Sequence, residues 1–233
     1  MKVKYEGHEQ LSVMSYAKNY NQKLYEFISK DIDSQTKILD FGAGIGEFSN
    51  RFPNQDRIHV LEPDKIQIAM SNTIHKYHSL SDLGSKKFDL IYSLNVLEHI
   101  EDDFKTVHKL VEHLNTDGEF RIFVPAKMIL YSSMDKAVGH FRRYEKQSLL
   151  NLFQDKTLEI KSCHYFDFLG FFIALLYKYI GDENGDVSKK SILFYDKIIF
   201  PISSFFDKIT LGKVLGKNLM IIVRKTDSTY LPS

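Results

Sequence analysis

The sequence predicts an α/β fold in which a mostly parallel sheet carries helices on both faces. Between Lys37 and Pro125, short apolar segments of strand length alternate with segments whose apolar residues recur every three or four positions. The segment "ILDFGAGIGEFS" (38–49) joins the first of these strands to three glycines at alternate positions. Open parallel sheets bind ligands where such a turn leaves the carboxyl end of a strand.

A helix with one apolar face is expected over residues 10–30. The core elements expected after it are, in chain order, strand 37–41, a helix from about Glu47, strand 57–62, a helix after 63–70, a weak strand near 74–80, strand 88–94, a helix through 102–114, a turn at Asp117 and Gly118, and strand 119–125.

The alternation ends after Pro125. We expect an acceptor-side region over 126–167, made of a polar loop, a helix near 145–153 and a strand at 158–166. Two aromatic-rich segments follow, and Pro201 should kink or divide the second of them. The last strand is expected at 217–225, so that residues 168–216 form an insertion before it.

Composition indicates one globular domain over residues 1–233, because 43% of residues are hydrophobic and 26% are charged. A net charge of +1 does not favour nucleic acid as a partner. The single cysteine, Cys163, fits a reducing cytoplasm. The first residues have no apolar core of a secretory signal, and no apolar stretch is long enough to span a membrane.

Gly42, Gly44 and Gly46 form a G-x-G-x-G turn. A dinucleotide fingerprint would place its third glycine where Glu47 stands, and no Gly-Lys-Ser/Thr follows to make a phosphate loop. Glu62 ends the next strand, where a carboxylate can accept hydrogen bonds from both ribose hydroxyls of an adenosine. The alternative is an acid that only caps a strand or helix.

The segments "LDFGAGIGEFS" and "FDLIYSLNVLEHIEDD", together with Glu62, resemble the class I S-adenosylmethionine-dependent methyltransferases, most closely their quinone-biosynthesis-type branch. The resemblance covers residues 37–125, and "NLMIIVRK" is similar to the family's final antiparallel strand. It implies a Rossmann-like sheet of seven strands, mostly parallel with an antiparallel last strand. It also implies S-adenosyl-L-methionine as cofactor and S-adenosyl-L-homocysteine as product.

The resemblance also assigns cofactor-binding residues. Those beside the methionine part are Asp40, Gly42, Gly44 and Gly46; Glu62 holds the ribose, Ser79 and Leu80 flank adenine, and Ser93 and Asn95 lie near the sulfonium. Asp89 opens its strand and is interpreted as structural.

Methyl transfer from a sulfonium is an in-line displacement, so catalysis can come largely from positioning the acceptor. The sequence lacks an Asn/Asp-Pro-Pro-Tyr/Phe run after the fourth strand, which counts against methylation of amino groups on DNA bases. A general base is needed only when the acceptor, such as a hydroxyl, must lose a proton.

The loop "YSSMDKAVGHFRRY" (131–144) holds the densest polar cluster in the chain. Within it we predict His140 as the base, and Asp135 and Tyr131 as groups that orient it or bind acceptor hydroxyls. Arg142 and Arg143 offer donor forks for an anionic acceptor. The alternative is a solvated loop whose arginines pair with helix acids. The run is similar to one in bacterial relatives that accompany surface-glycan and lipid-linked sugar synthesis.

Two further side-chain groups complete the candidates. Tyr20 of the first helix is predicted to help bind the acceptor. No metal is expected, because the acids after the fourth strand are interpreted as the start of a helix, with a metal site as the alternative; these residues are Glu98, His99, Glu101, Asp102 and Asp103.

The apolar segments 166–180 and 192–209 have three interpretations: a cover of ordinary core, a peripheral contact with membrane or lipid-linked substrate over 168–209, or a dimer face. A monomer and a homodimer are both compatible with the sequence. The expected location is the cytoplasm, with the inner face of the membrane as the peripheral site.

The sequence therefore predicts methyl transfer from S-adenosylmethionine to a small or lipid-linked, hydroxyl-bearing acceptor, which we expect to be anionic. The alternatives are a non-catalytic cofactor-binding or structural module of an assembly, and a nucleotide-sugar or NAD-dependent enzyme on a similar sheet.

Overall fold

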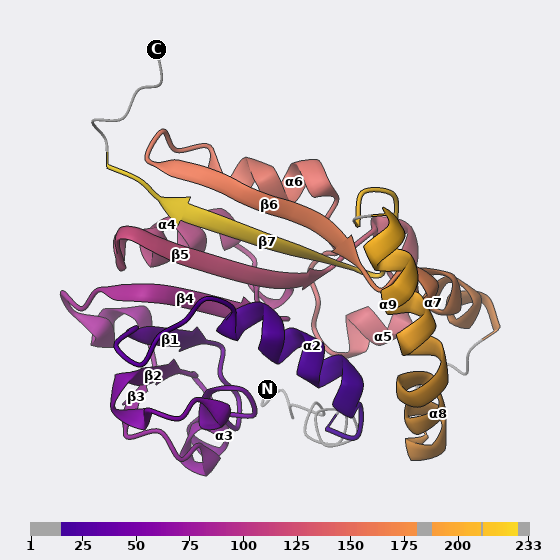
Figure 1. Cartoon of the computed structure of the whole chain (residues 1–233), viewed down its shortest axis with the longest axis horizontal. Helices are drawn as coiled ribbons and strands as arrows, with labels where there is room; N and C mark the ends of the chain where they lie inside the picture. The colour runs from indigo at the N-terminus through magenta and orange to yellow at the C-terminus, as the bar shows by residue number, and fades with distance from the viewer. Residues whose placement is uncertain (1–14, 181–187, 211, 228–233) are drawn as a thin grey trace.

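A seven-stranded sheet with the order β3-β2-β1-β4-β5-β7-β6 forms the centre of the molecule (Figure 1). The computed structural model describes residues 15–180, 188–210 and 212–227. The strands are β1 (Ile38–Phe41), β2 (Ile58–Leu61), β3 (His75–Tyr77), β4 (Phe88–Leu94), β5 (Leu114–Pro125), β6 (Leu158–Phe166) and β7 (Asn218–Lys225). Only β7 runs antiparallel to its neighbours, β5 and β6, which confirms the predicted fold class.

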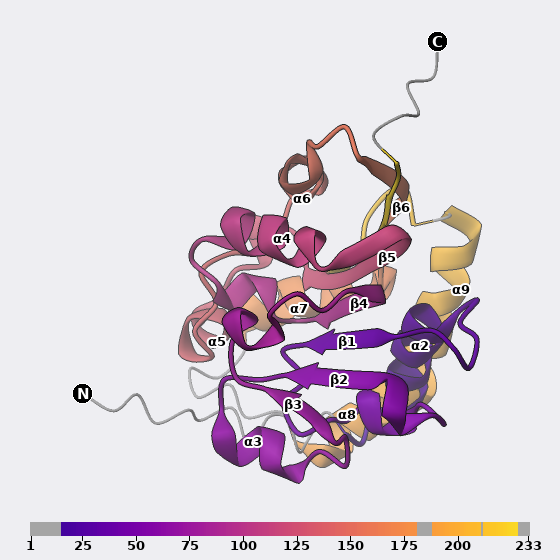
Figure 2. The same cartoon turned by 90° about the vertical axis from the view of Figure 1, so that its left-hand side faces the viewer.

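Eight α-helices are described: α2 (Lys18–Ser29), α3 (Lys65–Met70), α4 (Asp103–Glu112), α5 (Ser133–Ala137), α6 (Lys146–Leu150), α7 (Phe168–Ile180), α8 (Lys189–Phe194) and α9 (Phe200–Thr210). Val107 of α4 and Leu149 of α6 are buried against one face of the sheet. Leu24 of α2, Ile192 of α8 and Phe200 of α9 are buried against the other. Figure 2 shows α4 and α2 on opposite sides of the strands.

Several boundaries differ from the sequence prediction. In place of a helix from Glu47, the chain forms two short 3₁₀ turns, Ser49–Arg51 and Gln55–Arg57. The helix expected after 63–70 lies within that segment as α3, because the Asp64 side chain accepts hydrogen bonds from the backbone N–H groups of Ile66 and Gln67 and so caps it there. Residues 10–14 of the first predicted helix lie outside the described residues, and α2 begins at Lys18.

The predicted turn at Asp117 and Gly118 lies inside β5. The pairing with β4 passes from Phe88–Leu114 to Leu90–Glu119, so four residues loop out, and Asp117 has a φ of 62°. Asp89 has the structural role expected, since its carboxylate accepts hydrogen bonds from the Lys37 backbone N–H and the Asn115 amide.

Helices α7, α8 and α9 lie between β6 and β7 in the chain, beyond the carboxyl end of β6 (Figure 1). A buried carboxylate, that of Asp196, accepts hydrogen bonds from the backbone N–H groups of Asn19 and Tyr20 and so caps α2. Residues 189–210 are helical throughout, with a π-helical turn at Tyr195–Ile199 just before Pro201. Proline therefore changes the helix type without dividing the segment.

Candidate functional site

The glycine turn follows β1 at the carboxyl edge of the sheet. Gly42 and Gly44 have φ values of +78° and +54°. A Cβ at Gly42 would lie 2.3 Å from Val96 Cγ2, and one at Gly44 would lie 3.2 Å from Gln67 Oε1. The family resemblance implied that these glycines lie beside the methionine part of the cofactor. The structure adds that backbone conformation and packing against Val96 also require glycine.

The Glu62 carboxylate bridges this turn to the end of β2. It accepts hydrogen bonds from the backbone N–H groups of Gly44 (3.0 Å) and Asp64 (2.9 Å). An ionised carboxylate has about four lone-pair sites, so further acceptor capacity remains for ribose hydroxyls. The protein thus holds Glu62 in position before a ligand arrives.

Three further predicted cofactor residues lie at the ends of β1 and β4. Burial raises the pKa of Asp40 to about 7. The Ser93 hydroxyl is fully buried and has no hydrogen-bond partner among the described residues. Asn95 is exposed, with a φ of 54°. The unpaired, buried Ser93 hydroxyl and the buried Asp40 carboxyl group fit a polar ligand such as S-adenosylmethionine.

The residues predicted to flank adenine follow β3. Ser79 caps the 3₁₀ turn Leu80–Leu83 together with Asp82. The half-buried Leu80 packs against the main core. Their contact with adenine remains a prediction.

A continuous path of contacts leads from the glycine turn to the acceptor-side loop. Gly42 packs against Val96, and the backbone N–H of His99 donates to the Val96 carbonyl oxygen at 3.0 Å. The rings of His99 and His140 meet edge to face, with centroids 4.6 Å apart. This chain of contacts links the predicted base to the predicted cofactor turn, although the two are far apart in sequence.

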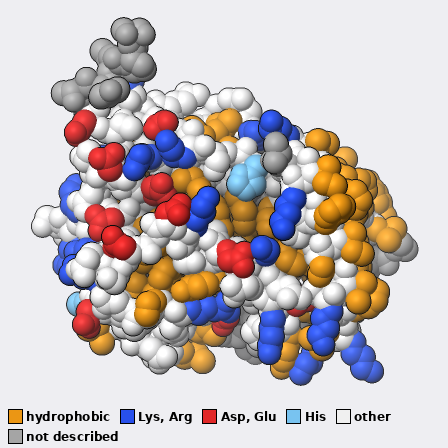
Figure 3. Space-filling view, in the orientation of Figure 1, with side chains coloured by type: hydrophobic (Ala, Val, Ile, Leu, Met, Phe, Trp, Pro, Cys, Tyr) orange, Lys and Arg blue, Asp and Glu red, His pale blue; other side chains and the backbone are white. Residues whose placement is uncertain are grey.

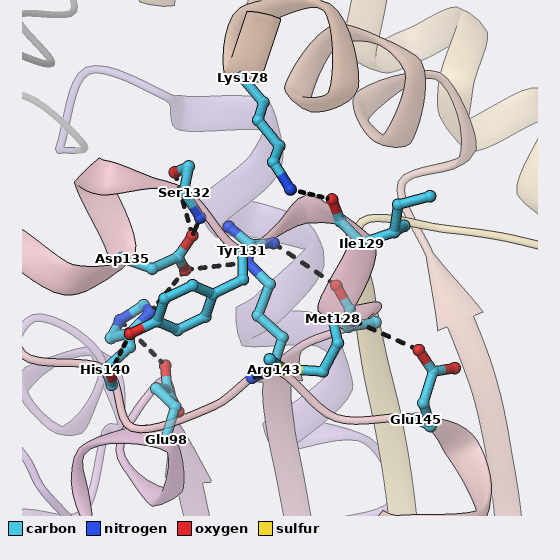
Figure 4. A network of polar contacts seen from close by, with 11 residues as sticks. Glu98, Met128, Ile129, Tyr131, Ser132, Asp135, His140, Arg143, Glu145 and Lys178 are labelled. Atoms are coloured by element: carbon cyan, nitrogen blue, oxygen red, sulfur yellow. Dashed lines mark hydrogen bonds and ion pairs between the residues drawn. The ribbon is translucent and has the colours of Figure 1, made fainter. Parts of the chain in front are cut away.

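The acceptor-side loop is organised around Asp135 (Figure 4). Its carboxylate lies 2.8 Å from His140 Nδ1 and accepts a hydrogen bond from Arg143 Nε at 2.9 Å. Burial raises the pKa of Asp135, but the bonds to His140 and Arg143 outweigh it and hold the pKa at about 2. The Tyr131 hydroxyl donates to the His140 carbonyl oxygen at 2.6 Å. The loop backbone and the histidine ring are thus both fixed.

Glu98 lies beside His140, whereas the sequence analysis interpreted it as part of a helix start, with a metal site as the alternative. It is fully buried, its Oε1 lies 3.9 Å from His140 Nε2, and neither oxygen has a hydrogen-bond partner in the described part of the chain. Burial raises the pKa of Glu98 to about 8, so the group is mostly neutral at pH 7. Its place in "SLNVLEH", directly after the fourth strand, was the signal that could have identified it, because that strand ends at the edge where the glycine turn lies.

Among the described residues, one group of side chains has ligand atoms that all lie within 4.8 Å of one another, as a metal would require. This group is Glu98, His99 and His140. Burial, followed by the charge of His140, lowers the pKa of His99 to about 4, which keeps the ring neutral. The expectation that no metal binds remains a prediction.

Both predicted substrate arginines make contacts within the protein. Arg142 pairs with Asp103 at 2.7 Å and donates to the Glu101 carbonyl oxygen. Arg143 pairs with Asp135 and donates to the Ala126 carbonyl oxygen at 3.5 Å. These ion pairs match one part of the alternative interpretation, in which the arginines pair with helix acids. The burial of Asp135 does not match its other part, a solvated loop.

Tyr20 lies in the core beneath the insertion. Its hydroxyl accepts a hydrogen bond from the Asn218 amide at 2.8 Å, and its ring packs against Phe166 and Phe200. These contacts give Tyr20 a packing role.

A cavity of about 320 Å³ lies at the amino ends of β1 and β2, beside Ile38 and Arg57. None of the predicted cofactor or acceptor residues line it.

Comparison with known proteins gives the same architecture. A phosphoethanolamine N-methyltransferase 2 of Haemonchus contortus, solved with S-adenosyl-L-methionine, is 14% identical with a TM-score of 0.60, over 96% of this chain and 58% of that chain. This chain therefore spans less than two thirds of that relative. A possible histamine N-methyltransferase of Thermotoga maritima is 10% identical with a TM-score of 0.61, over 95% and 96% of the two chains. The plantazolicin methyltransferase BpumL, solved with S-adenosyl-L-homocysteine, is 12% identical with a TM-score of 0.54, over 96% and 88%.

Identities this low show the fold alone. No curated protein matches the chain. A family model described as a methyltransferase domain matches residues 13–162, which is more than half of the sequence. The cofactor of such proteins is S-adenosyl-L-methionine, which is bound in one of these solved relatives, as its demethylated product is in another. The chain belongs to the methyltransferase-domain family that uses this cofactor.

Proposed function

We propose that this protein transfers the methyl group of S-adenosyl-L-methionine to a hydroxyl on a small or lipid-linked, anionic acceptor. The observation that supports this is the Asp135–His140 pair, because it offers a proton acceptor that is linked to the cofactor turn through His99 and Val96. We place the reaction in the cytoplasm, at the inner face of a membrane that residues 168–209 touch from one side.

Each residue has a defined task in this reaction. The bound cofactor supplies an electrophilic methyl group on sulfur. Glu62 and the glycine turn hold ribose and methionine. Asp135 accepts the Nδ1–H of His140, which leaves the lone pair on Nε2. His140 Nε2 takes the acceptor proton as the new O–C bond forms and the C–S bond breaks. Glu98, which is largely neutral at pH 7, lies beside Nε2, with its Oε1 at 3.9 Å.

The test measures transfer of labelled methyl groups to hydroxyl acceptors that carry phosphate, including lipid-linked sugars. His140→Ala should reduce turnover about 10²- to 10⁴-fold and leave cofactor affinity unchanged. Phe141→Ala, at an exposed neighbour, is the matched control and should keep wild-type turnover. Equal turnover of the His140 variant would remove the base from the proposal. Cofactor binding without transfer to any acceptor would favour the non-catalytic module.

A further inference from the structure

The segment formed by α8, the π-helical turn and α9 carries large apolar residues on its outer face, although Ile192 and Phe200 are buried on its inner face. Five large apolar residues recur on that outer face every three or four positions, with 48–63% of each residue's surface accessible; they are Phe194, Ile198, Ile202, Phe205 and Ile209. The inner face carries the buried polar residues Asp196 and Ser203. A helix that meets only water on its outer side carries mostly polar and charged residues there.

The polar residues of the inner face all have partners in the protein. Asp196 caps α2, and the Ser203 hydroxyl donates to Asp167 at 2.9 Å. Asp207 accepts hydrogen bonds from the backbone N–H groups of Asp167 and Phe168. These contacts hold the segment in one orientation, so its apolar face is directed outward by the fold.

Helix α7 extends this outer face. Phe172, Leu176 and Tyr179 are exposed on α7, and Phe168 stacks on Phe206 of α9 with ring centroids 5.6 Å apart. Figure 3 shows hydrophobic side chains gathered along the edge of the molecule where α7 and α9 lie, while the acidic side chains in this view lie mostly on the other side. No helix among the described residues is long and apolar enough to cross a membrane.

The exposed charges on this surface are positive. In the described parts of 168–217 the exposed charged residues are Lys178, Lys189, Lys190, Lys197, Lys208 and Lys213. The two acids there, Asp196 and Asp207, bind backbone N–H groups at the inner face. Asp182, Glu183 and Asp186 belong to the segment between α7 and α8, outside the described residues. Apolar side chains beside lysines fit an anionic lipid surface, because the negative lipid headgroups attract the lysine charges.

We propose that the outer face of α7, α8 and α9 docks on an anionic lipid bilayer and thereby brings the acceptor-side loop to the lipid headgroups. The link to the loop is direct, because Lys178 Nζ on α7 donates to the Ile129 carbonyl oxygen at 2.7 Å. Met128 and Ile129 are themselves exposed next to that contact. The role of the loop at the headgroups rests on the proposed function, whereas docking requires only the outer face of α7, α8 and α9.

The experiment is flotation of the full chain with vesicles of phosphatidylcholine, with and without phosphatidylglycerol. Wild type should float only with the anionic vesicles, and added salt should weaken binding. Phe205→Ser/Ile209→Ser and Lys190→Gln/Lys197→Gln/Lys208→Gln should each lower partitioning by at least about tenfold. Ile66→Ser and Lys156→Gln change exposed residues outside these helices and should bind like wild type.

Absence of flotation, or wild-type flotation of the lysine variant, would overturn the proposal. A dimer that Phe205→Ser/Ile209→Ser dissociates, without vesicle binding by wild type, would assign the face to a second copy of the chain. Calorimetry with S-adenosyl-L-methionine and transfer to a soluble acceptor use no vesicles, so failure of the proposed function is recognised separately from failure of docking.

Discussion

At the scale of single residues, Glu62 joins protein structure to ligand binding. Its carboxylate organises the Gly44 backbone and retains lone pairs for the ribose. Glu62→Ala should weaken S-adenosyl-L-methionine binding by roughly 1.5 to 3 kcal/mol, because charge-assisted hydrogen bonds are lost. Calorimetry measures this, with Glu47→Ala, at the neighbouring half-buried acid of the turn, as control. Unchanged affinity would show that Glu62 only supports the turn.

Asp40 gives a pH dependence. Its pKa is raised by burial from 3.8 to about 7, so the folded state binds the proton more tightly than the unfolded state. This contribution to stability is complete below about pH 4 and is lost as pH rises through about 7. The free energy of unfolding, measured with urea, should therefore fall more between pH 5 and pH 8 for wild type than for Asp40→Asn. Equal losses would contradict the shifted pKa.

At the scale of elements, the β1 turn depends on its contact with the turn after β4. Gly42→Ala should destabilise the protein by about 2 kcal/mol or more, because φ is positive and the new Cβ meets Val96. Gly84 also has positive φ but nothing within 4 Å of a Cβ, so Gly84→Ala measures the strain of the backbone alone. If urea unfolding gives equal losses for the two variants, the packing contact contributes nothing.

The insertion and α2 depend on each other through Asp196. Asp196→Ala should cost about 1 to 3 kcal/mol of unfolding free energy, because two backbone N–H groups of the first turn of α2 lose their acceptor. Asp196→Asn keeps one oxygen and should lose less. Limited proteolysis should cut α2 faster in the alanine variant, and an unchanged rate would show that the cap does not hold the helix.

At the scale of the whole molecule, a ligand that binds only the folded state stabilises all of it. S-adenosyl-L-methionine and S-adenosyl-L-homocysteine at about 100 times Kd should each raise stability by about 2.7 kcal/mol, measured as a higher Tm. NAD should give no shift, because Glu47 replaces the third glycine of its fingerprint. A shift with NAD alone would support the alternative enzyme class.

Strand periodicity and glycine spacing are local properties of the chain, so they predicted the strands of a mostly parallel sheet and the position of the glycine turn. The antiparallel last strand was implied by the resemblance to the methyltransferase family. Short elements were less predictable: α3 and the turn at Ser49–Arg51 depend on caps and packing rather than on periodicity. The folded structure was needed to show that Glu98 lies beside His140, that Arg143 pairs with Asp135 and that Tyr20 is buried in the core. These facts join residues from different elements, and a one-dimensional pattern carries no information on which side chains meet when the sheet brings its carboxyl ends together.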